Sequence, residues 1–200
     1  MPGIEATLRA SGIKTIAGVD EAGRGPCAGP LVIAAVILKN IDSSLLTRVR
    51  DSKLLSEKVR EELFEVIKGE SVLYSIIEIS AAEIDEFGLH RSNLEGMRRA
   101  INSLSITPDY VLTDGYAIDG LAIQNLAVWK GDQVALSISA ASILAKVYRD
   151  RIMIEMDSKY PEYGFAKHKG YVTAAHSAAL AKFGVSAVHR KSFSNVAALL

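Results

Sequence analysis

The short apolar run 14–20 ends in a carboxylate pair, Asp20 and Glu21, ahead of a segment rich in glycine and proline (22–30). A carboxylate beside an apolar core is costly unless it is paired or binds a cation. Neighbouring side chains on a strand point to opposite faces, so we expect the strand to end at this pair and let both acids reach one cation. Capping a helix or a turn is the alternative role.

Two further acids follow apolar segments later in the chain. Asp114 comes directly after a short apolar run, and Asp132 lies in a Lys-Gly-Asp-Gln sequence. Each one alone is also consistent with an ordinary turn. With Asp20 and Glu21 they make four acids from three strand ends or nearby loops, and all-oxygen ligand sets suit hard cations such as Mg²⁺ and Mn²⁺. No set of Cys and His with the spacing of a zinc site occurs.

The glycine-rich segment from Gly23 to Ala28 also fits the G-x-G-x-x-A pattern of dinucleotide-binding proteins. That pattern requires a helix to begin at the glycines, whereas two prolines here lead into another β-branched run. No Gly-Lys dipeptide occurs, which excludes a P-loop. We therefore expect Gly23 and Gly25 to bring backbone N–H groups close to a sugar or phosphate, with Arg24 beside them. A purely structural turn is the alternative.

Basic residues provide candidate phosphate contacts. Lys53 follows Asp51 and Ser52, which are typical turn or cap residues, and it is either a phosphate contact or plain surface charge. The segment 163–171 places cations among aromatic residues and ends at Tyr171, a combination that suits nucleic acid. Taken singly, Tyr163, Phe165 or Tyr171 is more often part of the core than a stacking platform.

The periodicity of apolar residues predicts strands alternating with helices, and therefore an α/β domain with a mixed sheet. Polar chemistry collects where strands end, which is where α/β sheets usually place active sites. The predicted strands cover 14–20, 31–38, 71–79, 110–113 and 123–129. Helices are predicted over 56–68 and 137–157, and two short helices are predicted after Tyr160. A short helix is predicted to begin at a capping box made by Ser80 and Glu83. A longer helix is predicted to follow, with one apolar face made by Leu94, Met97, Ile101 and Leu104.

The composition is that of one ordinary globular domain, with 200 residues, 49% of them hydrophobic and 23% charged. The formal net charge is zero, so charge alone does not indicate a nucleic-acid ligand. The longest apolar run, 31–38, is shorter than the roughly 20 residues needed to cross a bilayer, so we expect no membrane segment. The N-terminal segment 1–10 does not have the pattern of a secretion signal, and the single cysteine, Cys27, fits a reducing compartment. We therefore expect a cytoplasmic protein.

Seven segments, in order along the chain, resemble the bacterial type 2 ribonuclease H family, ribonuclease HII. Together they run from about Ile16 to Phe193. They are GVDEAGRGP (18–26), DSK (51–53), DG (114–115), KGD (130–132), SAASILAKVYRD (139–150), YGFAKHKGY (163–171) and HRKSF (189–193).

The resemblance implies a ribonuclease H-like fold: a central mixed β-sheet flanked by helices, with a helical C-terminal part. We therefore expect one catalytic domain over 1–200, in which about 160–200 form the substrate-binding part. The related type 3 enzymes carry an extra N-terminal substrate-binding domain. We do not expect it here, because only about fifteen residues precede the first predicted strand.

The resemblance also implies an activity. Family members hydrolyse the RNA strand of RNA–DNA hybrids and nick 5′ of single ribonucleotides embedded in duplex DNA, functions of ribonucleotide excision repair and DNA replication. The implied mechanism uses two ions of Mg²⁺ or Mn²⁺ and leaves 5′-phosphate and 3′-hydroxyl ends. The implied partners are therefore these duplexes. We also expect a monomer, because the sequence contains no heptad pattern.

Site residues follow from the resemblance position by position. Asp20, Glu21, Asp114 and Asp132 match the four acidic positions, of which the first three are the most firmly described metal ligands. The remaining matches concern the substrate. Gly23, Arg24 and Gly25 match the loop that senses the ribose 2′-hydroxyl, Tyr171 matches a tyrosine that packs against the sugar at the ribonucleotide–deoxyribonucleotide junction, and Lys53 matches a lysine near the phosphates.

Two other classes of protein are alternatives to this one. A nucleotide-binding ATPase or dehydrogenase is disfavoured by the missing P-loop and by the strand after the glycines. A catalytically silent module that binds hybrids would keep the region of Tyr171 and dispense with the acids. All four acids are present, which disfavours the silent module.

Overall fold

The computed structural model describes residues 3–200, and its centre is one mixed sheet of five strands in the order β3-β2-β1-β4-β5. The first three strands are antiparallel neighbours, whereas β4 and β5 run parallel to β1. The carboxyl ends of β1, β4 and β5 therefore meet at one edge of the sheet. The strands are β1 (Ile16–Ala22), β2 (Leu31–Leu38), β3 (Ser71–Ile79), β4 (Tyr110–Asp114) and β5 (Asn125–Val128).

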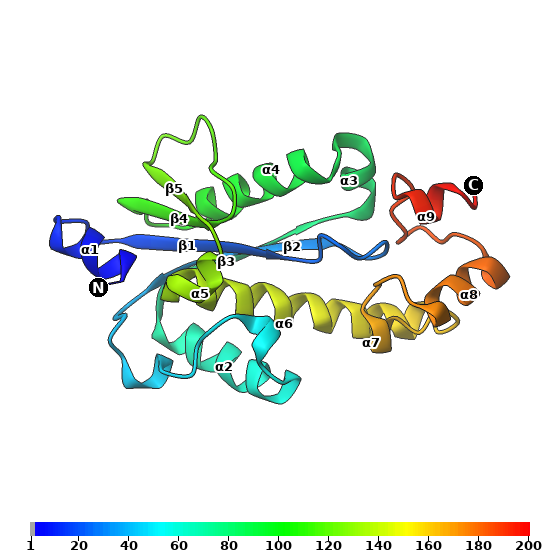
Figure 1. The fold of residues 1–200 in the computed structure, drawn as a ribbon, viewed down its shortest axis with the longest axis horizontal. Coiled ribbons are helices and arrows are strands. Elements are labelled where there is room, and N and C mark those ends of the chain that lie inside the picture. The colour runs from blue at the N-terminus through cyan, green and yellow to red at the C-terminus, as the bar shows by residue number, and fades with distance from the viewer. Residues whose placement is uncertain (1–2) are drawn as a thin grey trace.

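Helices cover both faces of the sheet, as predicted (Figure 1). The long α6 (Leu136–Lys159) and α2 (Glu57–Glu70) pack on one face, and α3 (Ala81–Phe87) and α4 (Leu89–Asn102) lie on the other. Every residue of β2 is buried because this strand lies between the two helical layers. No helix within residues 3–200 is both long and apolar enough to cross a membrane.

Close approach of α6 to β1 depends on Gly18. A Cβ atom at this position would overlap the backbone of Ser137 and Ile138 in the first turn of α6. The start of α6 is in turn capped by Glu5, whose carboxylate accepts hydrogen bonds from the N–H groups of Leu136 (2.7 Å) and Ser137 (3.0 Å). A buried carboxylate at this end also complements the helix dipole. Glu5 belongs to α1 (Ile4–Ala10), a helix that the sequence analysis did not predict.

Three sequence predictions need correction. The strand β1 does not end at Asp20 but continues to Ala22, because it keeps pairing with β2 as far as Val32. The helix α4 ends at Asn102, so Leu104 is buried beyond its last turn. The C-terminal part contains three short helices instead of two, and a short α5 precedes α6. These helices are α5 (Gly131–Val134), α7 (Phe165–His168), α8 (Ala174–Phe183) and α9 (Ser194–Ala197).

The C-terminal part lies at the far end of α6, opposite α1 (Figure 1). It has a small apolar cluster of its own, in which Tyr163 and Phe165 are buried. These two aromatic residues therefore belong to the core, the alternative that the sequence left open. Tyr171 remains 46% exposed. The predicted capping box at Ser80 and Glu83 is confirmed at the start of α3.

Candidate active site

Three aspartates converge at the sheet edge where β1, β4 and β5 end. Carboxylate oxygens of Asp20, Asp114 and Asp132 all lie within 4.8 Å of one another. Asp20 comes from β1, Asp114 is the last residue of β4, and Asp132 lies in α5 just beyond β5. The parallel arrangement of these strands brings together residues more than one hundred positions apart in the chain.

Backbone hydrogen bonds orient two of the three carboxylates, those of Asp20 and Asp114. The N–H of Glu21 donates to Oδ1 of Asp20 (2.7 Å), and the N–H of Gly131 donates to Oδ1 of Asp114 (2.7 Å). The second bond ties the end of β4 to the turn that carries Asp132. That turn is sharp because Lys130 adopts a left-handed conformation, with φ of 53°. The aspartates are therefore positioned before any ligand binds.

The cluster concentrates negative charge in a buried place. Burial, followed by the carboxylates of Glu21 and Asp114, raises the pKa of Asp20 well above its usual value. Burial, followed by the carboxylates of Asp51 and Asp114, also raises the pKa of Asp132. Ionised carboxylates this close repel one another, and a bound cation would relieve the repulsion. The donor set consists of oxygen atoms alone, which fits a hard divalent cation.

Glu21 lies beside this triad but on the other face of β1. Its side chain is paired with Arg24, at 3.5 Å between Oε1 and the guanidinium, and burial raises its pKa. Within residues 3–200, its Oε2 atom is buried without a hydrogen bond, as are both amide atoms of Asn93 in α4. The charge of Arg24, followed by the nearby Asn93 amide, limits this rise in the pKa of Glu21. The Asn93 amide and the Glu21 carboxylate lie near each other without forming a hydrogen bond. The continuation of β1 explains why Asp20 and Glu21 diverge.

The glycine loop, defined as residues 23–25, is held by a buried arginine of the C-terminal part. The Arg190 guanidinium donates to the carbonyl oxygens of Gly23 (2.7 Å), Arg24 (3.1 Å) and Gly29 (2.9 Å). Burial lowers the pKa of Arg190 to about 9, which leaves it charged at neutral pH. The positive charge faces carbonyl dipoles, and these carbonyls define the path of the loop.

A second buried arginine, Arg149 of α6, holds the other side of the same turn. It donates to the carbonyl oxygens of Pro30 (2.9 Å), Ala28 (3.1 Å) and Lys169 (3.0 Å). Gly23 has a φ of 100°, and a Cβ atom at this position would overlap the Arg149 side chain. Only glycine therefore fits at position 23.

Tyr171 packs against the glycine loop. A Cβ atom added to Gly25 would lie 3.5 Å from Cε1 of the tyrosine ring, so the ring lies beside the loop. The backbone preceding the ring is tied to the loop by a hydrogen bond of 3.0 Å from the N–H of Cys27 to the carbonyl of Gly170. Nδ1 of His176 lies 2.9 Å from the Tyr171 carbonyl.

Lys53 reaches the acidic cluster from a separate segment. Its Nζ lies 3.7 Å from Oδ2 of Asp132, and its side chain is 78% exposed. Asp51 accepts a hydrogen bond of 2.9 Å from the N–H of Lys53, which confirms the cap role that the sequence favoured. The structure thus brings the nine predicted site residues into one region, with Glu21 outside the aspartate triad.

Comparison with known proteins decides the family. The profile of the family described as Ribonuclease HII matches residues 17–196. The chain is 56% identical over 196 residues to a ribonuclease HII of Frankia casuarinae, across 98% of this chain and 82% of that protein. The chain belongs to the ribonuclease HII family. It is accordingly a metal-dependent ribonuclease H, a hydrolase that acts on RNA–DNA hybrids.

Other ribonuclease HII relatives and solved structures agree. The match to the ribonuclease HII of Mycobacterium avium is 53% identical over 193 residues and spans 96% of this chain and 84% of that protein. The crystal structure of the ribonuclease H2 from Pyrococcus horikoshii OT3 superposes with a TM-score of 0.80 at 29% identity, over 93% of this chain and 97% of that one. A ribonuclease HIII solved with Mn²⁺ shares the fold at 16% identity and a TM-score of 0.68, over 95% and 71%.

Several residues around the site were not predicted from the sequence. Ser142, Lys146 and Arg149 of α6 line the cavity that contains Tyr171. Their spacing of four and three residues puts them on one helical face, a signal that was present in the quoted segment 139–150. Arg190 stood in another quoted segment, but nothing in a linear pattern shows that it is buried. Asn93 had no signal.

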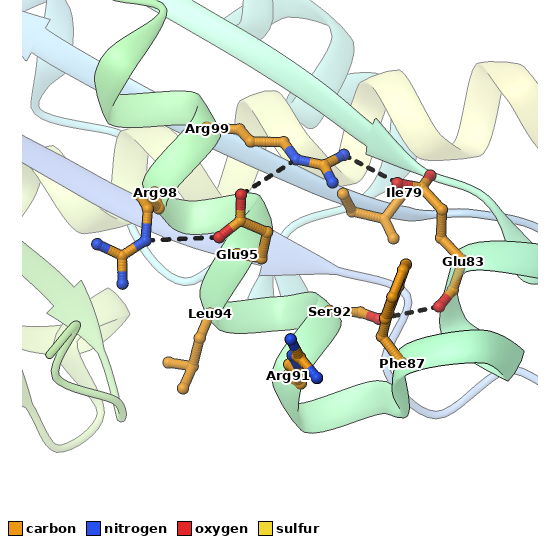
Figure 2. Close-up of a pocket in the computed structure, with 9 residues that line it drawn as sticks. All are labelled: Ile79, Glu83, Phe87, Arg91, Ser92, Leu94, Glu95, Arg98 and Arg99. Carbon is orange, nitrogen blue, oxygen red and sulfur yellow. Dashed lines mark hydrogen bonds and ion pairs between the residues drawn. The ribbon is translucent and has the colours of Figure 1, made fainter. Parts of the chain in front are cut away.

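A separate cavity of about 360 Å³ lies between α3 and α4, and none of the predicted site residues lines it (Figure 2). Two of its three arginines are paired with carboxylates: Arg99 lies between Glu83 (2.9 Å) and Glu95 (3.5 Å), and Arg98 pairs with Glu95 (3.4 Å). The third, Arg91, lies over the Phe87 ring, 5.6 Å from its centroid. An anion would compete with Glu83 and Glu95 for the two paired arginines.

Proposed function

We propose that this chain is an endoribonuclease that cuts the RNA strand of RNA–DNA hybrids and nicks 5′ of single ribonucleotides in duplex DNA. One arrangement carries the proposal. The aspartate triad adjoins a cavity of about 250 Å³ whose lining includes Asp20, the glycine loop and Tyr171. The residues that would bind metal and those that would contact one sugar therefore lie at the same cavity.

The aspartate triad would hold divalent cations, either Mg²⁺ or Mn²⁺, with Glu21 beside it. When bound, two such cations supply activation of the attacking water and stabilisation of the leaving 3′ oxygen, which yields 5′-phosphate and 3′-hydroxyl ends. The protein itself contributes fixed carboxylates, aimed by the N–H groups of Glu21 and Gly131. It also contributes the cation of Lys53 beside Asp132, where a phosphate would approach.

The ribose would be read by the glycine loop and Tyr171. A 2′-hydroxyl both donates and accepts hydrogen bonds, so backbone groups of Gly23 and Gly25 and the tyrosine hydroxyl are suitable partners. These groups contact a sugar and leave the base free, which makes cutting depend on sugar type and little on sequence. Arg24 and Lys53 complete the set as phosphate contacts. In the cell, we propose a cytoplasmic monomer that acts in ribonucleotide excision repair and DNA replication.

A cleavage assay on a labelled duplex with one ribonucleotide tests this function. In Mg²⁺ or Mn²⁺, the wild-type protein should nick once, on the 5′ side of the ribonucleotide, and should spare the same duplex with a 2′-deoxy or 2′-O-methyl nucleotide in that place. Equal cleavage of the three duplexes would overturn the reading of the ribose. Absence of any cleavage in either metal would overturn the nicking activity itself.

A further inference from the structure

Two cavities meet at the acidic cluster, and the proposed function uses only one of them. The first contains the glycine loop and Tyr171. The second, of about 480 Å³, is lined by Asp114 and Asp132 and extends towards the end of β5. Glu21, Arg24 and Lys53 line both cavities, so the two lie on either side of these shared residues. A strand that crosses the acids would enter both.

Trp129 is the outstanding feature of the second cavity. It is the only tryptophan of the chain, and 81% of its surface is exposed. Tryptophan is usually well buried, so a water-exposed ring beside a metal centre calls for a ligand. The residue follows β5 directly and precedes Lys130, whose left-handed conformation forms the turn into α5. Trp129 thus stands three positions before Asp132 in the chain, and both residues line this cavity.

The rest of the lining has the chemistry of a nucleotide site. The Arg24 guanidinium stacks on the Tyr116 ring, 4.6 Å from its centroid. Lys130 adds a second cation next to Trp129. Aromatic rings near basic side chains suit a base or sugar together with its phosphate. The carboxylates of Asp114 and Asp132 belong to the same lining, and the phosphate to be cut would lie beside them.

We propose that the second cavity binds the nucleotide on the 5′ side of the scissile phosphate, and that Trp129 contacts that nucleotide. The inference rests on the proposed function, which places the ribonucleotide in the cavity of Tyr171 and the cut on its 5′ side. The nucleotide on the 5′ side must then extend from the acidic cluster into the second cavity, away from Tyr171. The Trp129 ring meets it there without selecting the base, because every base has a stacking face.

Tryptophan fluorescence provides a direct test, since Trp129 is the sole source of the signal. The Asp114→Asn variant, in Mg²⁺, is titrated with a duplex that carries one internal ribonucleotide. It is also titrated with a shortened duplex whose labelled strand begins at that ribonucleotide. The internal duplex should change the emission, and the shortened duplex should bind with little change. An equal response to both duplexes, or no response to either at saturation, would overturn the proposal.

Kinetics of the wild-type protein and of Trp129→Ala give an independent readout. Loss of the ring should raise KM for the internal duplex roughly ten-fold and leave kcat within about two-fold, because stacking contributes to binding. Trp129→Phe should recover most of the loss. Val134→Ala serves as a matched control, because Val134 is an exposed α5 residue outside the cavity lining. An unchanged KM in Trp129→Ala would refute the subsite, whereas a wild-type protein that cuts nothing would refute the proposed function instead.

Discussion

Nε2 of His189 lies 3.0 Å from Nε2 of His176. The hydrogen bonds at the Nδ1 atoms of the two rings determine which Nε2 carries the proton. Nδ1 of His189 accepts a hydrogen bond from the N–H of Ser186 (3.1 Å), so its proton must sit on Nε2. His176 then accepts at Nε2 and donates from Nδ1 to the carbonyl of Tyr171 (2.9 Å). Two neutral histidines therefore connect Ser186 to Tyr171, the residue that would pack against the ribose.

Acid should destabilise this connection. Burial, followed by the charge of His176, lowers the pKa of His189 to about 4, and burial also lowers the pKa of His176. An unfolded histidine takes up a proton below about pH 6.5. At these two positions the unfolded chain therefore binds more protons between about pH 6.5 and 4, and the stability that the histidines contribute falls as pH falls through this window. The raised pKa values of Asp20, Glu21 and Asp132 act in the opposite direction, so the histidine contribution is read from the difference in melting temperature between the wild type and a histidine variant across the window. His189→Asn should remove its share of the contribution, and an unchanged slope in that variant would contradict the assignment.

Removing one carboxylate of the triad should abolish catalysis without unfolding the protein. Asp20→Asn and Asp114→Asn keep the size of the side chain and remove a charged ligand from a cluster whose members lie within 4.8 Å. We expect kcat to fall by more than about 100-fold, since even outer contacts of a metal site are worth 10- to 100-fold. Circular dichroism and, after treatment with EDTA, the melting temperature should stay at least close to those of the wild type. Near-normal turnover in Mg²⁺ for either variant would show that the ligand assignment is wrong.

Binding of the cation should stabilise the folded protein. The buried carboxylates repel one another without it, and a ligand that binds only the folded state raises stability by mass action. After treatment with EDTA, addition of Mn²⁺ to about one hundred times its Kd should raise the melting temperature by roughly 5–10 °C. The rise should be much smaller in Asp20→Asn. A rise of the same size in that variant would place the cation elsewhere.

Arg190→Lys should destabilise the glycine loop, because it removes hydrogen bonds to the carbonyl oxygens of the loop. Lysine lacks the planar fork that reaches three carbonyl oxygens, so at least one buried carbonyl of the loop loses its partner. We expect a loss of about 2–4 kcal/mol in the free energy of unfolding, measured by denaturation in urea. KM for the duplex with one ribonucleotide should rise as well. Lys191→Ala, next to it but exposed, is the control and should change neither quantity.

The sequence by itself determined the local elements and the chemical types at the site. A β-branched run predicts β2 wherever it stands, and Ser80 with Glu83 caps α3 through bonds between residues three positions apart. The four acids and the glycine loop stand out because carboxylates after apolar runs and repeated glycines are unusual locally. Such signals span only a few residues, so a linear pattern contains them completely.

Tertiary structure alone decided how these parts meet. The direction in which Asp20 and Glu21 point depends on the pairing of β1 with β2 beyond Asp20, which a single strand does not reveal. The burial of Arg190 and the capping of α6 by Glu5 join residues more than one hundred positions apart. These features arise from packing free energy and long-range hydrogen bonds, which depend on which surfaces come together in space and leave no periodic trace in the chain.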